Sequence, residues 1–195
     1  NVSRETYECL ELAMAVWHET KGAFDVTVAR EASSDETWTS GMKQFALCEN
    51  ERIQVSEAGL ALDLGGLGKG FALDEISQLY QEHDIANAFL DSGGSTFLAM
   101  GNESAAAEGW PASIGPYGVI ALKNQALSAS GFEVQGQHII DPRTGLPVET
   151  GRQRTWVQTE SAALADALST ATLVMSDEEI EQFCEAHPEV TVMMG

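Results

Sequence analysis

The sequence is short of basic residues. It has 10 Lys and Arg against 30 Asp and Glu, a formal net charge of −20. Such a chain repels polyanions, which argues against nucleic acid or an anionic membrane surface as a partner. Between Arg52 and Arg143, only Lys69 and Lys123 are basic. A lone lysine inside a glycine cluster is therefore more informative here than in a Lys-rich protein.

Cysteines and long apolar runs are also scarce. The three cysteines have no CxxC spacing, so they indicate neither a zinc site nor a disulfide framework. No run approaches the roughly 20 apolar residues of a membrane helix, so we expect no membrane-spanning segment. The sequence starts at Asn1 without Met or a signal-peptide hydrophobic region. We expect any targeting segment to lie outside this sequence.

The pattern of apolar residues and turns predicts one α+β domain over residues 1–195, mostly an antiparallel sheet with flanking helices. Helical spacing predicts helices over 3–20, 69–82 and 161–175, and a further one starting at Ser176 with a Ser176–Glu179 capping box. Strands are expected at 23–28, 59–64 and 189–194, and in short segments between 87 and 158. Residues 31–51 are expected to form a polar surface connection, with a possible short strand in "QFALC".

The loop "DLGGLGKGFALD" (63–74) lies between an expected strand and an expected helix. Backbone N–H groups at such a junction can face a phosphate, and glycines allow a ligand to approach the chain closely. The glycine spacing fits neither a P-loop nor GxGxxG. The positive charge of Lys69 favours an anion-binding site over a tight turn without a ligand. The flanking Asp63 and Asp74 argue against binding of an anion by charge alone.

Two further patterns suggest chemistry. Asp166 and Thr170 are four residues apart on an expected helix with apolar neighbours, so they share one face. A hard cation such as Mg²⁺ would satisfy them, although local capping and a bond from Thr170 to the helix backbone are the alternative. His138 begins the segment "HIIDPRTGLPV" and could act as a general base or be a simple strand residue.

Taken together, the motifs resemble those of ApbE-type FAD:protein FMN transferases. The matching segments are "GAFDVTV", "DLGGLGKGFALD", "FLDSGGSTFLAMG", "HIIDPRTGLPV" and "LADALSTA", in the order of the family. The resemblance implies a T-fold-related domain. It also implies Mg²⁺-dependent cleavage of FAD and transfer of FMN to a Thr or Ser hydroxyl of a target protein.

The resemblance assigns roles to individual residues. Asp166, Thr170 and the backbone carbonyl of Gly66 would be metal ligands, and His138 and Asp166 would form the catalytic centre. The implied FAD contacts are Ala23, Phe24, Asp25, Asp63, Lys69 and Ile140. Family members are commonly envelope-facing lipoproteins, so we expect a location in the cell envelope or periplasm.

The chain also departs from the family. We expect it to be a compact member without the usual N-terminal segment, which supplies further FAD contacts. The stretch from Ser130 to His138 is shorter than usual. An alternative is therefore a non-catalytic flavin-binding or structural module that kept the fold but lost part of the FAD pocket. Attachment of FMN to this chain itself has little support.

Overall fold

The structure is a computed structural model that describes residues 1–28, 40–56, 59–131, 139–148 and 150–195. The helices in these ranges are α1 (Arg4–Glu19), α2 (Gly68–Glu82), α3 (Ala162–Val174) and α4 (Asp177–Ala186), with short 3-10 turns η1 (Gly41–Gln44) and η2 (Gly115–Tyr117). None of these helices has the length and apolar character needed to cross a membrane.

The main sheet has five strands in the order β3-β4-β7-β8-β9, and every neighbouring pair is antiparallel. Their bounds are β3 (Ala88–Ser92), β4 (Thr96–Met100), β7 (Gln125–Gly131), β8 (Arg154–Thr159) and β9 (Thr191–Met194). Two separate antiparallel pairs accompany it, β1 (Phe45–Cys48) with β2 (Arg52–Val55) and β5 (Trp110–Ser113) with β6 (Val119–Leu122). The predicted mixture of helices and antiparallel sheet is confirmed.

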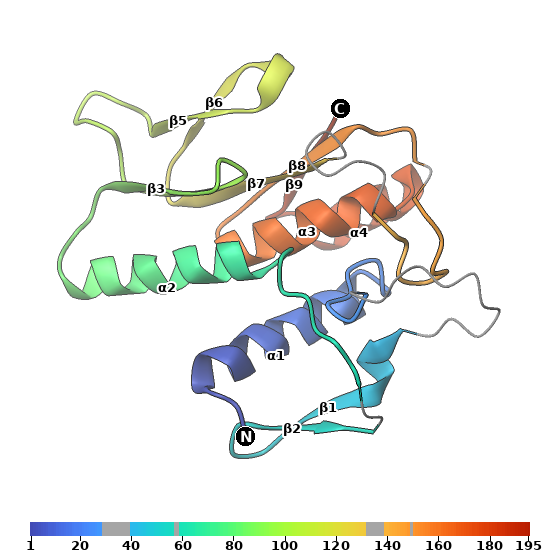
Figure 1. Ribbon diagram of the computed structural model, residues 1–195. Helices are drawn as coiled ribbons and strands as arrows, with labels where there is room; N and C mark the ends of the chain where they lie inside the picture. The colour runs from blue at the N-terminus through green and yellow to red at the C-terminus, as the bar shows by residue number, and fades with distance from the viewer. Residues whose placement is uncertain (29–39, 57–58, 132–138, 149) are drawn as a thin grey trace.

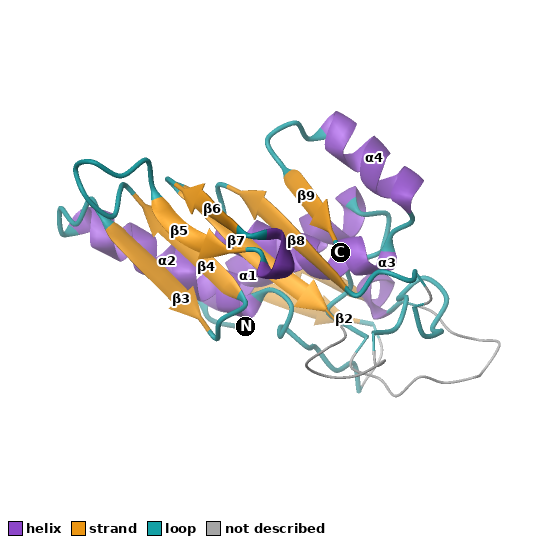
Figure 2. Ribbon diagram, turned by 90° about the horizontal axis from the view of Figure 1, so that it is seen from above, coloured by secondary structure: helices purple, strands orange, loops and turns teal. Residues whose placement is uncertain are grey.

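The elements form layers (Figure 1). Helices α2 and α3 lie side by side on one face of the sheet, and the β5–β6 pair covers part of the other face. Helix α1 packs on α3 from the side away from the sheet, with the β1–β2 pair beyond it. Figure 2 shows the same sheet from above, with α4 beside β9 at one end.

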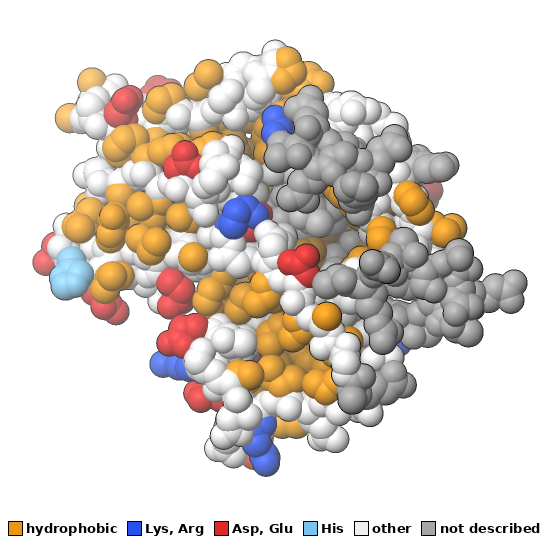
Figure 3. All heavy atoms as spheres, in the orientation of Figure 1, with side chains coloured by type: hydrophobic (Ala, Val, Ile, Leu, Met, Phe, Trp, Pro, Cys, Tyr) orange, Lys and Arg blue, Asp and Glu red, His pale blue; other side chains and the backbone are white. Residues whose placement is uncertain are grey.

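The core follows from this layering. The largest apolar cluster joins α1, α3 and the segments before α2, and a second cluster around Leu127 and Trp156 fills the space under the β5–β6 pair. Some apolar side chains are exposed to solvent and not part of the core, among them Ile76 and Leu79 of α2. Figure 3 shows hydrophobic side chains gathered over this helix.

Local sequence explains the helix ends. The Ser3 hydroxyl accepts the Thr6 N–H at 3.2 Å at the start of α1. Helix α4 begins with the predicted capping box, in which Ser176 and Glu179 each accept a backbone N–H of the other.

Two predicted strands are wrong. Residues 23–28 form turns, because the Asp25 carboxylate accepts the Thr27 N–H and such local bonds compete with a sheet ladder. Residues 59–64 form no strand either, and Asp63 accepts the Gly65 N–H in the same way. A hydrogen bond of 2.7 Å from the Asp63 N–H to the Val26 carbonyl joins the two segments.

Two other expectations need correction. The strand Arg52–Val55 was missed, because no element was expected between the polar connection at 31–51 and the strand at 59–64. Of the expected strand in "HIIDP", the described part contributes a single bridge between Ile140 and Pro147.

Candidate active site

The carboxylate of Asp166 is buried on the face of α3 that meets the sheet and α2. Its side chain is 3% exposed. Thr96 of β4 and Ser128 of β7 donate their hydroxyls to Oδ1 at 3.2 and 3.3 Å. The Gly70 N–H of α2 donates to Oδ2 at 3.2 Å. A carboxylate buried this deeply needs such partners, because an unpaired buried charge is very costly.

Lys69 supplies the positive charge. Its Nζ lies 3.1 Å from Asp166 Oδ1 and donates to the Gly65 carbonyl at 2.8 Å. An ion pair from Lys69 therefore joins the glycine-rich segment to the helix that carries Asp166.

Helices α2 and α3 can approach closely enough for this pair because Gly70 has no side chain. A Cβ at this position would lie 2.0 Å from the Ala162 carbonyl oxygen. Asp74, one turn further along α2, fixes the contact. Its carboxylate accepts the Ala162 and Ala163 N–H groups at 2.8 and 3.0 Å and the Ser161 hydroxyl at 2.7 Å. Asp74 thus provides an acceptor for buried N–H groups at the start of α3 that have no partner within the helix.

Thr170 continues the same face of α3 one turn after Asp166. Its Oγ1 lies 3.2 Å from the Ser130 hydroxyl and 3.4 Å from the Asp166 carbonyl, so the local bond weighed from the sequence is present. A Cβ built on Gly66 would lie 3.2 Å from Thr170 Oγ1, which shows that the loop and α3 are in direct contact here.

A cavity of about 220 Å³ opens beside Gly66 and Thr170. Most of the residues predicted to bind FAD or metal line it, together with apolar neighbours that the sequence reasoning missed. The predicted members are Ala23, Phe24, Asp25, Asp63, Gly66, Ile140 and Thr170, and the additional ones are Val28, Ile139, Pro142 and Val174.

The segment with Ala23, Phe24 and Asp25 forms one wall of this cavity, and hydrogen bonds fix it. The Thr20 hydroxyl accepts the Phe24 N–H at 3.1 Å, and the Asp25 carboxylate accepts hydrogen bonds from the Thr27 N–H, at 2.7 Å, and the Ser40 hydroxyl. Asp25 therefore has partners within the protein and fixes the loop, whereas the sequence suggested only a flavin contact.

Arg143 fixes the opposite wall. It pairs with Asp141 at 2.9 Å and Glu179 at 2.6 Å, and donates to the Val174 carbonyl at the end of α3. The side-chain hydrogen bond to Asp141 is the largest of the effects that raise the pKa of Arg143. This guanidinium stays charged and holds the segment with Ile140 against α3.

The predicted base His138 lies outside the described residues.

The oxygen atoms around Asp166 fit a divalent ion. A carboxylate, the Thr170 hydroxyl and backbone carbonyls of the loop are the oxygen ligands that hard cations take. The Lys69 ammonium already occupies a cation position between Asp166 and a loop carbonyl, so the site is built for positive charge. Among the described residues there is no group of three or more His, Cys, Asp or Glu side chains that could hold a metal.

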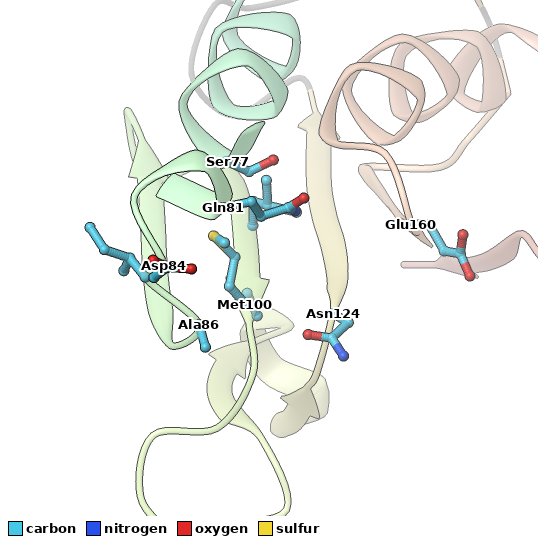
Figure 4. A pocket seen from close by; sticks show the side chains of 10 residues that line it. Ser77, Gln81, Asp84, Ala86, Met100, Asn124 and Glu160 are labelled. Carbon is cyan, nitrogen blue, oxygen red and sulfur yellow. The ribbon is translucent and has the colours of Figure 1, made fainter. Parts of the chain in front are cut away.

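A second cavity, of about 460 Å³, lies further along α2 (Figure 4). Its lining includes Ser77 and Gln81 of α2, Met100 of β4, and the carboxylates of Asp84 and Glu160. Ser77 follows Lys69 by eight residues, about 12 Å along the helix axis. Because its charged lining residues are acidic, this cavity disfavours a diphosphate, and none of the predicted site residues line it.

Comparison with known proteins decides the family. The model of the ApbE family matches residues 1–194. The chain belongs to the ApbE family. An ApbE relative from Treponema pallidum, named FAD:protein FMN transferase, is 35% identical over 149 residues, covering 65% of this chain and 41% of the relative. This chain spans less than two thirds of the length of the first curated ApbE relatives it matches.

Solved ApbE structures share the fold. The ApbE protein of Thermotoga maritima matches with a TM-score of 0.82 and 29% identity, over 100% of this chain and 74% of that one. The flavin transferase ApbE of Vibrio cholerae matches with a TM-score of 0.84 and 24% identity, over 99% of this chain and 71% of that one. The predicted family and fold are therefore confirmed.

Proposed function

We propose that this chain binds FAD and, with a divalent metal such as Mg²⁺, transfers its FMN half to a Thr or Ser hydroxyl of a target protein. The observation that carries the proposal is the cavity beside Gly66 and Thr170, which opens within one helical turn of the buried Asp166 carboxylate. The names of the curated ApbE relatives agree with this activity.

In this reaction the acceptor oxygen forms a bond to the phosphorus of the FMN half, and the diphosphate bridge breaks to release AMP. With water as the acceptor, the products are FMN and AMP. The acceptor hydroxyl also loses a proton, and His138 is proposed as the base that takes it, on the strength of the family motif alone.

The residues of the cavity divide the remaining tasks. Phe24 and Ile140 offer apolar surface for the isoalloxazine ring, and the loop at Gly66 offers backbone close to the phosphates. Asp166 and Thr170 would hold the metal, which supplies positive charge to the phosphate oxygens when bound. Lys69 would add a second cation, which matters in a chain of net charge −20.

The assay is incubation of the purified chain with FAD and Mg²⁺, with AMP measured by chromatography. Asp166→Ala should abolish AMP release, because it removes the carboxylate ligand. Asp91→Ala is the control, since the bond that this exposed aspartate makes within the described residues is to the Gly94 N–H in the β3–β4 turn. A folded wild-type chain that releases no AMP with Mg²⁺ or Mn²⁺ would contradict the proposal.

One observation favours the alternative of a flavin-binding module without turnover. The cavity of about 220 Å³ is smaller than the roughly 300–1,000 Å³ of typical ligand pockets, so the described residues enclose only part of a molecule as large as FAD. Tight FAD binding without AMP release would support this alternative. The extent of the domain over residues 1–195 and the location in the cell envelope stay predictions.

A further inference from the structure

Lys69 closes the open side of the Asp166 carboxylate. Its ammonium lies 3.1 and 3.2 Å from the two carboxylate oxygens. The other observed donors to these oxygens, from Gly70, Thr96 and Ser128, are uncharged. The lysine is thus the counter-ion of a carboxylate that is almost completely buried.

The inference drawn from this ion pair rests on the proposed function, but the ion pair conflicts with the separate roles that Asp166 and Lys69 have in it. There, Asp166 binds a divalent ion while Lys69 contacts the diphosphate. A divalent ion and an ammonium repel each other strongly at contact distance, so they cannot share the same side of one carboxylate. One of the two cations has to leave.

Lys69 is the partner that can move. Its side chain is 37% exposed, and its ammonium group lies at the end of a flexible four-carbon chain. The other donors are fixed, because Gly70 donates from the backbone and Thr96 and Ser128 are fully buried on central strands. Lys69 also lies in the first turn of α2, which begins at Gly68. The helix dipole there favours anions, so a phosphate would be stabilised where the released ammonium can reach it.

We propose that Lys69 is an exchangeable counter-ion. It neutralises Asp166 in the metal-free chain, leaves the carboxylate when a divalent ion binds, and is then free to contact the FAD diphosphate. The two ligands therefore bind with positive cooperativity. By linkage, FAD raises the affinity for the metal by the same factor as the metal raises the affinity for FAD.

The direct test measures binding of Mn²⁺ alone, followed by the electron paramagnetic resonance signal of the free ion. If the lysine occupies Asp166 in nine of ten molecules or more, its removal tightens the apparent Kd at least about tenfold. We expect this gain for Lys69→Met and a Kd near the wild-type value for Lys69→Arg, which keeps a competing cation. Lys123→Met, at an exposed position on the turn before β7, should have no effect.

Thermal stability gives a second readout that keeps the test valid if Lys69→Met folds poorly. Without metal, Lys69→Met should melt below the wild type, because Asp166 loses its counter-ion. Saturating Mn²⁺ should raise the Tm of Lys69→Met by more than that of the wild type, since tighter binding stabilises the fold further.

The outcomes separate this inference from the proposed function. Equal or weaker Mn²⁺ binding by Lys69→Met would overturn the exchange, as would Mn²⁺ binding by none of the proteins. Tighter binding by Lys69→Met together with no AMP release by the wild type would sustain the exchange and contradict the transferase.

Discussion

The contact between α2 and α3 makes Gly70→Ala the most informative single substitution for the fold of the site. The added Cβ would lie 2.0 Å from the Ala162 carbonyl oxygen, 2.4 Å from its carbonyl carbon and 2.7 Å from Ala163 Cα. All three atoms belong to the backbone, so no rotamer change relieves the clash. The helices must separate by more than an ångström, which pulls Lys69 and the Gly70 N–H away from Asp166.

Overpacking of this kind costs about 1–3 kcal/mol, and a clash with backbone places Gly70→Ala near the upper end, at about 3 kcal/mol. For a chain of this size that corresponds to a fall in Tm of about 6–12 °C. Thermal and urea unfolding followed by circular dichroism would measure it. The same variant should lose AMP release, because the Asp166 site is disturbed.

Gly68→Ala is the matched control in the same helical turn. A Cβ there would meet the Leu64 Cβ at 3.8 Å, an ordinary contact, so its Tm should equal or exceed that of the wild type. If the Tm of Gly70→Ala lies within about 2 °C of the wild-type Tm, the backbones of α2 and α3 are not in contact. Such a change in Tm is smaller than the least that overpacking of about 1 kcal/mol would cause.

Two further predictions concern capping. Asp74→Ala should lower the free energy of unfolding by about 1–3 kcal/mol, because N–H groups at the start of α3 lose their acceptor. The control is Glu75→Ala at the neighbouring exposed position, which should change the free energy of unfolding little. Equal effects of the two substitutions would refute the capping role of Asp74. For Glu179, burial raises the pKa, but the Ser176 N–H and the Arg143 guanidinium outweigh it and lower the pKa below its usual value. The charged form of Glu179 therefore stabilises the fold at pH values above the pKa of the unfolded chain. At pH 7, Glu179→Gln should be less stable than the wild type by at most about 1 kcal/mol. This difference should vanish as the pH falls below about 4, where the carboxylate becomes protonated. Urea unfolding at several pH values would measure this, and a pH-independent difference would contradict it.

Helices were predictable from this sequence because their signals are local. The Ser3 cap, the Ser176 capping box and the apolar spacing within α3 each act over a few residues, and the structure has these helices where the patterns placed them. The wrong strands at 23–28 and 59–64 have an apolar alternation that fits a strand. Side-chain bonds from Asp25 and Asp63 to nearby N–H groups override that alternation.

The candidate site was predictable in its motifs but not in its contacts. The glycine-rich loop and the Asp166–Thr170 pair were identified separately, and the cavity shows that Gly66 and Thr170 meet. The hydroxyls of Thr96 and Ser128 were missed, because ordinary strand residues give no signal until the sheet brings them to Asp166. The role of Asp74 was also missed, since its partners are 87 to 89 residues away in the sequence.

The most direct test of the proposed metal and flavin site is a crystal structure of the chain with FAD and Mn²⁺. We expect an anomalous Mn²⁺ peak at the Asp166 carboxylate and the Thr170 hydroxyl, with the flavin in the cavity beside Gly66 and with Lys69 turned from Asp166 to the diphosphate. Flavin bound in the acidic cavity near Ser77 and Glu160, or Mn²⁺ bound away from Asp166, would contradict it.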